Sequence, residues 1–265
     1  MTGAHAETAS PPGGSLSGRR ALVTGGAGGI GLAIVRALAA RGAHVIVADV
    51  DRARCDAVAT EVGGSSWPVD LLDPAAVAET ELAPVIADVD ILVNNAGIQH
   101  ISPLEDFEPQ EFRRIVTLML EVPFLLIRAA LPGMYARGFG RIINVSSVHG
   151  LRASAYKSAY VAAKHGLEGL SKVAALEGGE HGVTSNCVNP GYVRTALVEK
   201  QIADQARVHG IPEAEVLAQI MLTESAIKRL VEPEEVASLV AWLAGDEASM
   251  VTGASYAMDG GWSAR

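Results

Sequence analysis

Short apolar runs alternate with longer helix-like stretches along the chain from about residue 20. β-Branched runs such as "ALVT", "HVIVAD" and "DILVNNAG" are separated by segments of ten or more residues with helical character. This rhythm is typical of βαβ units, in which a parallel sheet is buried between helices on both faces. Further candidate strands lie in "WPVD", "RIINVSS", "VTSNCVNPG" and "ASYAMDGG". The pattern predicts an α/β chain: one doubly wound Rossmann fold with a seven-stranded parallel sheet over residues 18–265.

Three segments need a separate interpretation. Residues 1–17, in "MTGAHAETASPPGGSLSG", have neither a basic start nor an apolar run, so we expect a disordered leader rather than a signal peptide or membrane anchor. Residues 196–228 resemble helices covering a site, and we expect a small helical lid that excludes water. The apolar stretch 115–134 is interrupted by Glu121, Pro123 and Arg128, which favours a buried helix over a membrane span.

Composition limits the classes of partner. The chain has 265 residues, 49% of them hydrophobic, which is enough for one large core. Its formal net charge is -9 and its basic residues are scattered, which argues against nucleic acid and anionic membranes. An anionic substrate would therefore need local positive groups. The two cysteines, Cys55 and Cys187, lack metal-ligand spacing; we expect small buried side chains and no metal site.

A glycine-rich loop follows the first predicted strand. "TGGAGGIG", residues 24–31, leads directly into a predicted helix. Its glycines allow a tight turn and a close approach to a pyrophosphate at the helix N-terminus, where free N–H groups and the helix dipole favour negative charge. Such a loop can be purely structural, but the flanking strand and helix favour a dinucleotide site. The expected cofactor contacts here are Thr24, Gly25, Gly29, Ile30 and Gly31.

Acidic and amide side chains end the next predicted strands. Asp49 lies 18 residues beyond Gly31, where a carboxylate can accept hydrogen bonds from ribose hydroxyls and repel a 2′-phosphate. It therefore predicts NAD rather than NADP, unless it is a helix N-cap, a role that Asp51 could also take. Asp70 and "NNAG", 94–97, end the third and fourth strands at the edge where ligands bind, although either could serve an ordinary turn.

Three residues predict acid–base catalysis. Tyr160 and Lys164 lie one helical turn apart in "YVAAK", and Ser147 ends the fifth predicted strand. A phenol with a pKa of about 10 needs a nearby cation to act as a base near neutral pH, and Lys164 on the same helix face can supply it. Ser147 can hold the substrate oxygen beside the phenol. Tyr160 would then take a hydroxyl proton as hydride moves to a nicotinamide. A lone Tyr/Lys pair would be a solvated helix face; the serine and the glycine loop favour catalysis.

These motifs together resemble the short-chain dehydrogenases/reductases. The resemblance spans nearly the whole chain from residue 18 and is carried by "TGGAGGIG", "NNAG", Ser147 thirteen residues before "YVAAK", and "NPGYVRT" at 189–195. It implies a homotetramer, and the lack of targeting signals together with a need for NAD favours a cytoplasmic location. It also implies cofactor contacts around the adenosine, the ribose and the nicotinamide, namely Asp49, Asp70, Leu71, Asn95, Gly97, Tyr160, Lys164, Pro190, Gly191, Val193 and Thr195.

One position departs from the family pattern. Many members have an asparagine in the helix before the fifth strand, where it supports a water chain to the lysine. The matching position here is Met119, in "MLEVPF". Methionine cannot form those hydrogen bonds, so we expect a different proton relay. A dinucleotide-binding protein without catalysis is the alternative that this position leaves open.

A second set of residues indicates the substrate. Within the family, "NNAGIQH", "SSVHG", "EKQI" and the final "DGGW" most resemble members that oxidise (R)-3-hydroxybutyrate. A small acid has few atoms, so its carboxylate must carry recognition, and amide donors with one or two cations suit that task. The resemblance implies that four residues hold the carboxylate and that two shape the wall: Gln99, His149, Lys157 and Gln201, with Tyr192 and Trp262.

Each of these substrate residues could instead be an ordinary surface or loop residue. Tyr192 stands where the resemblance implies a tryptophan, and Glu199 places a negative charge nearby. Another small hydroxy acid, a 3-oxoacyl thioester, a sugar or a polyol therefore remains an alternative substrate.

Overall fold

The computed structural model describes residues 15–73, 75–78, 84–196, 198–199, 202, 206–207 and 210–264. Its centre is a seven-stranded sheet in the order β3-β2-β1-β4-β5-β6-β7, and every neighbouring pair is parallel. The predicted fold is therefore confirmed. The strands are β1 Arg20–Thr24, β2 His44–Asp49, β3 Ser65–Pro68, β4 Ile91–Asn94, β5 Gly140–Val145, β6 Val183–Pro190 and β7 Ser255–Met258.

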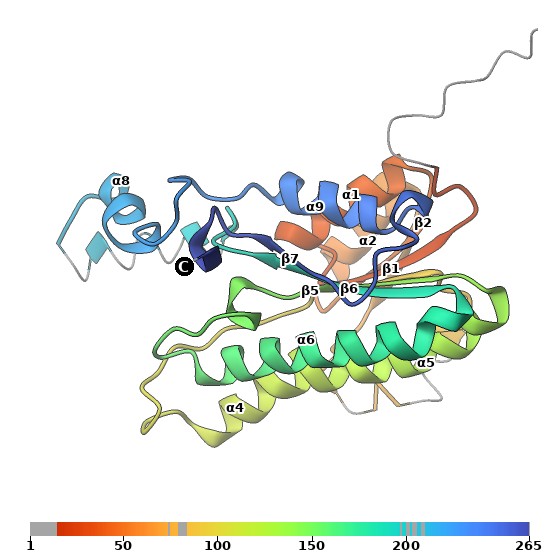
Figure 1. Cartoon of the computed structure of the whole chain (residues 1–265), viewed down its shortest axis with the longest axis horizontal. Helices are drawn as coiled ribbons and strands as arrows, with labels where there is room; N and C mark the ends of the chain where they lie inside the picture. The colour runs from red at the N-terminus through yellow and green to blue at the C-terminus, as the bar shows by residue number, and fades with distance from the viewer. Residues whose placement is uncertain are drawn as a thin grey trace, which may run out of the picture.

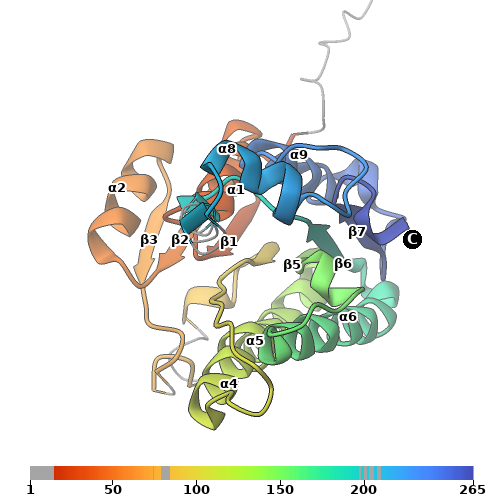
Figure 2. The same cartoon turned by 90° about the vertical axis from the view of Figure 1, so that its left-hand side faces the viewer.

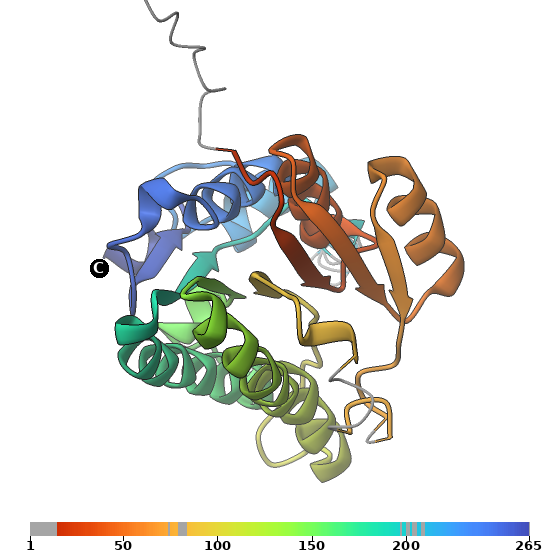
Figure 3. The ribbon, with the colours of Figure 1, turned by 90° about the vertical axis from the view of Figure 1, so that its right-hand side faces the viewer.

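Helices cover both faces of the sheet, as Figures 1 and 3 show. One layer contains α1 Gly29–Ala40, α2 Arg52–Val62 and α9 Pro233–Leu243, and α1 packs directly on α9. The other layer contains α4 Pro109–Val116, α5 Val122–Arg137 and α6 Ser158–Gly178. Because successive side chains of a strand point to opposite faces, Val23 joins the core under α1 while Leu22 joins the core over α5.

The long apolar helical segment runs under the sheet. Pro109–Arg137 is long and apolar enough to cross a membrane by length and composition, within the described residues. Ile115, Leu126 and Met134 are nevertheless fully buried in the core shared with the sheet. The segment is therefore buried on one face only, since Phe124 on the opposite face is 47% exposed. A π-helical turn over Thr117–Glu121 interrupts the segment between α4 and α5.

The folded domain includes residues before the predicted boundary at residue 17. Leu16 is 2% exposed, and its backbone N–H donates to the Arg41 carbonyl at 2.8 Å. The boundary after residue 17 is therefore too late, because a single leucine was missed in a polar stretch. Residues 1–14 of the predicted leader lie outside the described residues. Cys55 and Cys187 are both buried, as expected.

The predicted lid is described in part. It contains the short helix α8 Glu213–Val216 and a π-helical turn at Leu217–Met221. In Figure 1, α8 lies beyond the end of the sheet, outside the two helical layers, and Figure 2 shows that end facing the viewer. Val198, Val216 and Leu230 form a separate apolar cluster against which Tyr192 packs. The segment therefore has a small core of its own next to the end of β6.

Candidate active site

The glycine loop is closed by contacts with the end of β4. Asn95 Nδ2 donates to the carbonyls of Thr24 at 2.9 Å and Gly25 at 3.1 Å, and Thr24 Oγ1 accepts from the Asn95 N–H at 3.0 Å. Gly25 has a φ of +63°, and a Cβ on Gly31 would overlap the Gly25 carbonyl oxygen. Both positions therefore require glycine. The first turn of α1 has no side-chain cap, which leaves its N–H groups available to an anion.

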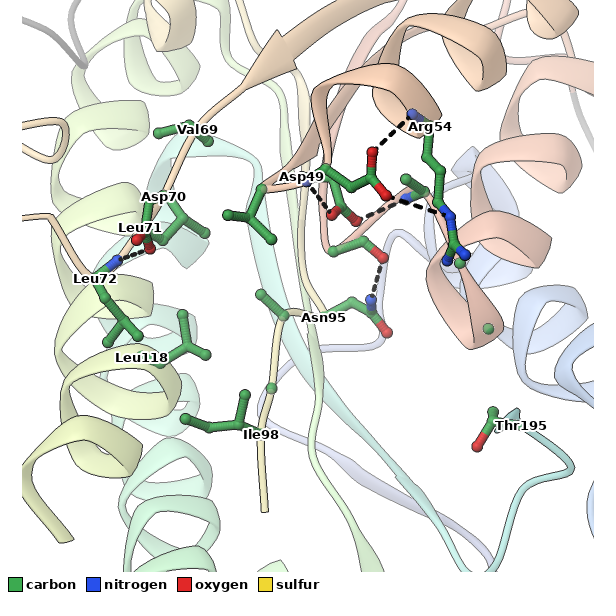
Figure 4. A pocket seen from close by; sticks show the side chains of 18 of the residues that line it. Asp49, Arg54, Val69, Asp70, Leu71, Leu72, Asn95, Ile98, Leu118 and Thr195 are labelled. Atoms are coloured by element: carbon green, nitrogen blue, oxygen red, sulfur yellow. Dashed lines mark hydrogen bonds and ion pairs between the residues drawn. The ribbon is translucent and has the colours of Figure 1, made fainter. Parts of the chain in front are cut away.

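A cavity of about 520 Å³ opens beside this loop at the carboxyl edge of the sheet (Figure 4). Most of the residues predicted to contact the adenosine and ribose meet there, although they come from separate strand ends. Thr24 and Gly31 are buried beneath the loop rather than exposed to the cavity. The predicted residues that line the cavity are Gly25, Gly29, Asp49, Asp70, Leu71, Asn95, Gly97 and Thr195.

Asp49 faces the cavity and does not cap a helix. Its Oδ2 accepts from the Ala27 N–H at 3.0 Å and its Oδ1 from the Asp51 N–H at 3.1 Å. Asp51 caps α2 by accepting from the Arg54 N–H. Asp51, and not Asp49, is therefore the residue that caps α2. Asp70 does serve its turn, because its Oδ1 accepts from the Leu72 N–H at 2.9 Å, yet it also lines the cavity.

A second pocket, of about 140 Å³, lies next to the first and shares Thr195 with it. It brings together residues from five segments of the chain that the sequence could only group by resemblance. Gln201 lies outside the described residues. The predicted residues that line this pocket are Ile30, Gln99, Ser147, His149, Lys157, Tyr160, Gly191, Tyr192, Val193, Thr195 and Trp262. Pro190, at the buried end of β6, lines neither cavity.

Tyr160 and Ser147 face each other in this pocket. Burial raises the pKa of the Tyr160 phenol, and a hydrogen bond with Ser147 partly offsets that rise. Lys164 lies behind the tyrosine, with its Nζ 5.7 Å from the ring centroid, and donates to the Val145 carbonyl at 2.6 Å. Burial lowers the pKa of Lys164 to about 8, and the electrostatic influence of Cys187 and Glu168 partly offsets that fall. The lysine is therefore a cation at neutral pH that loses its proton more readily than usual.

His149 is a neutral side chain in this pocket. Burial, with smaller contributions from Lys157 and His165, lowers its pKa to about 4. Its Nε2 lies 2.9 Å from Ser154 Oγ and its Nδ1 3.4 Å from Ser147 Oγ, while its ring packs 5.3 Å from that of Trp262. Of the pair His149 and Lys157, only the lysine can therefore be a cation near neutral pH, because desolvation keeps the imidazole uncharged.

Among the described residues that line this pocket, Lys157 is the cation. Burial lowers its pKa, and its Nζ lies 5.5 Å from the centroid of the Tyr192 ring. Among the described residues it has no carboxylate or hydrogen-bond partner. Tyr192 thus supplies an aromatic face to the ammonium group while leaving its donors for a ligand. Glu199 is held away, because it pairs with Arg194 at 3.3 Å.

Met119 occupies the π-helical turn between α4 and α5. It is 1% exposed, and its side chain packs against Gly97 at the end of β4. The residue lies where the resemblance placed it, and an apolar side chain fills that space. No hydrogen bond to the lysine can pass through this side chain.

Several lining residues were not found from the sequence. Arg54, Arg114, Leu118 and Ile98 border the larger cavity, and Val148 borders the smaller one. None belongs to a motif with a chemical signature, and their positions follow from helix packing. Glu168 was also missed, because its burial depends on strands far away in the sequence.

Comparisons with known proteins show which proteins this chain resembles. Residues 25–263 match a family model described as enoyl-(acyl carrier protein) reductase. A D-beta-hydroxybutyrate dehydrogenase of Rhizobium meliloti (strain 1021) is 46% identical over 258 residues, which cover 93% of this chain and 99% of the relative.

Two solved structures have the same fold. A short chain dehydrogenase/reductase family protein has a TM-score of 0.84 at 36% identity, covering 95% of this chain and 100% of its own. A putative 2-deoxy-D-gluconate 3-dehydrogenase from Agrobacterium tumefaciens with bound NADP has a TM-score of 0.82 at 33% identity, covering 95% of this chain and 98% of its own. This chain therefore belongs to the short-chain dehydrogenase/reductase family and is an oxidoreductase.

Proposed function

We propose that the protein catalyses the reversible, NAD-dependent oxidation of (R)-3-hydroxybutyrate to acetoacetate. The observation that carries the proposal is the partly buried Lys157 ammonium, which lines the same small pocket as Ser147 and Tyr160. A buried charge without a partner is costly, so a site of this kind suits an anionic substrate. The similarity to a D-beta-hydroxybutyrate dehydrogenase supports the same substrate.

The pocket size favours a short acid over a larger ligand. Its volume is about 140 Å³, whereas pockets for drug-sized ligands measure roughly 300–1,000 Å³. Trp262 and Val148 give it apolar walls, while Lys157 and Gln99 supply donors. A substrate with a carboxylate at one end and a secondary alcohol two carbons away can reach both Lys157 and the tyrosine. A long acyl thioester would have to extend out of this pocket.

The mechanism assigns each side chain a separate task. Ser147 Oγ binds the substrate hydroxyl and holds it toward Tyr160, whose phenolate form accepts the hydroxyl proton. The Lys164 cation lowers the cost of forming the phenolate, so a tyrosine whose pKa burial raises can still act as a base. His149 packs behind Ser147 and donates or accepts as a neutral group. NAD, when bound, supplies the hydride acceptor.

We propose NAD rather than NADP as the cofactor. Asp49 places a carboxylate in the adenosine end of the larger cavity, where it can accept from ribose hydroxyls and would repel a 2′-phosphate. Arg54 lines the same cavity, but its Nε lies 3.4 Å from Asp51 Oδ2, so its charge is already partly compensated. A structural neighbour has NADP bound, so the activity of this protein with NAD must be compared with its activity with NADP.

We also propose a cytoplasmic homotetramer. Phe112, Phe124 and Leu176 expose large apolar side chains on α4, α5 and α6, the layer on one face of the sheet. Covering such side chains would stabilise an assembly. Light scattering of the purified protein tests this proposal, and a mass equal to one chain would reject it.

The decisive experiment follows NADH absorbance with the D and L forms of 3-hydroxybutyrate and with the neutral alcohol 2-butanol, each with NAD and NADP. We expect turnover of the D form with NAD. Preference for NADPH and long acyl thioesters would instead favour a 3-oxoacyl thioester reductase. Tight NADH binding without turnover of any alcohol would favour a non-catalytic protein.

A further inference from the structure

A buried carboxylate lies next to the catalytic residues without a role in the mechanism above. Glu168 follows Lys164 by one turn of α6 and is 5% exposed. Its Oε1 accepts from Asn189 Nδ2 at 2.5 Å and its Oε2 from Ser255 Oγ at 2.6 Å. These partners lie on β6 and β7, so the carboxylate joins the helix to two strands. Ionisable side chains of this type are rarely buried to this extent unless a partner is present.

Asn189 connects this carboxylate to the catalytic serine. The same Nδ2 that donates to Glu168 also donates to the backbone carbonyl of Ser147 at 2.9 Å. The loop that follows Ser147 is packed closely on the carboxylate, because a Cβ on Gly150 would lie 2.8 Å from Glu168 Oε1. The position of Ser147 in the pocket therefore depends on a contact chain that starts at Glu168.

Glu168 also provides negative charge near the buried lysine. Burial lowers the pKa of Lys164 to about 8, and the charge of Glu168 opposes that fall. The other ionisable groups around Lys164 are the Tyr160 phenol and the Cys187 thiol. Burial and the nearby Glu168 both raise the pKa of the Cys187 thiol. The phenol and the thiol are neutral in their ordinary protonated forms. Among the described groups around Lys164, Glu168 is thus the carboxylate, and it accepts hydrogen bonds from Asn189 and Ser255.

We propose that Glu168 is a positioning residue of the active site, which fixes Ser147 through Asn189 and stabilises the positive charge of Lys164. The inference rests on the roles given to Ser147 and Lys164 in the proposed function, and it does not depend on which alcohol is oxidised.

The test compares Glu168→Gln with Glu177→Gln in the full-length protein. Both substitutions remove one negative charge from α6, but Glu177 is exposed. For Glu168→Gln we expect kcat to fall about tenfold and the alkaline limb of its pH profile to move down by about one unit, because the lysine loses a neighbouring anion. Glu168→Asp should keep the limb at its wild-type position. We expect no change in Glu177→Gln.

Two further measurements separate this inference from its alternatives. A ¹³C NMR titration of the Lys164 Cε, assigned with Lys164→Arg, follows the lysine without turnover and should show the same downward shift in Glu168→Gln. Glu168→Gln could lower Tm while leaving kcat, the alkaline limb and the Lys164 titration as they are in Glu177→Gln. That result would mean that Glu168 is only structural. If wild-type protein oxidises no alcohol, the proposed function fails, while the titration still decides the inference.

A second variant covers the case in which Glu168→Gln does not fold. Asn189→Ala keeps the carboxylate but removes its link to Ser147. We expect kcat to fall at least fivefold with the alkaline limb unchanged. A kcat within twofold of wild type would overturn the link to the serine.

Discussion

Replacing Lys157 with methionine tests the substrate assignment most directly. Methionine keeps most of the side-chain length that packs toward Tyr192 and removes the ammonium group. A hydrogen bond to a charged group contributes about 1.5–3 kcal/mol, and each 1.4 kcal/mol is about tenfold in binding. Because Lys157 is partly buried, solvent screens its charge less than that of a surface lysine. We therefore expect the KM for 3-hydroxybutyrate to rise about 10- to 100-fold.

The kcat should change much less, because the ammonium group binds the carboxylate equally in the ground state and the transition state. The assay follows NADH absorbance at saturating NAD, with 2-butanol as a substrate that lacks the carboxylate. Lys172→Met is the matched control, since Lys172 is exposed on the same helix. A KM for the acid within twofold of the control value, or an equal loss with 2-butanol, would refute the assignment of Lys157 to the carboxylate.

Three further predictions follow from the same geometry. Because burial lowers the pKa of Lys164 to about 8, its positive charge is lost as pH rises, so kcat should decline above about pH 8 in a pH–rate profile; a flat profile to pH 10 would contradict this role. Gly31→Ala places a methyl group against the Gly25 carbonyl and should lower the free energy of unfolding by roughly 1–3 kcal/mol, as measured by urea denaturation. The affinity for NADH, measured by fluorescence titration, should fall as well. Asp49→Ser removes the carboxylate from the adenosine end and should reduce the ratio of kcat/KM for NAD over NADP by about tenfold or more; an unchanged ratio would mean that another residue selects the cofactor.

Local sequence patterns predicted most of the fold because they report local geometry. The β-branched runs at Arg20–Thr24 and His44–Asp49 had to be buried on both faces, and that burial requires helices between them. The positions of Tyr160 and Lys164 on one helix face follow from helical spacing alone. Leu16 was missed because one apolar residue in a polar stretch has no periodicity.

The charge states at the site could not be predicted from residue types. A histidine and a lysine suggested one or two cations, yet His149 is neutral because it is buried, with its ring packed against Trp262. Lys157 is less buried than His149 and lies against the Tyr192 ring. Desolvation depends on all neighbouring segments, which no spacing in the sequence specifies.

The sequence by itself determined the class of fold, the glycine loop and the Tyr160–Lys164 pair, since each depends on conformations that neighbouring residues impose. Only the tertiary structure decided which strand ends meet, that Asp49 faces a cavity while Asp51 caps α2, and that Glu168 lies behind Lys164 bound to Asn189 and Ser255. The physical reason is that burial, pairing and pocket shape arise from contacts between residues distant in the chain, whose partners are set by packing of the whole core.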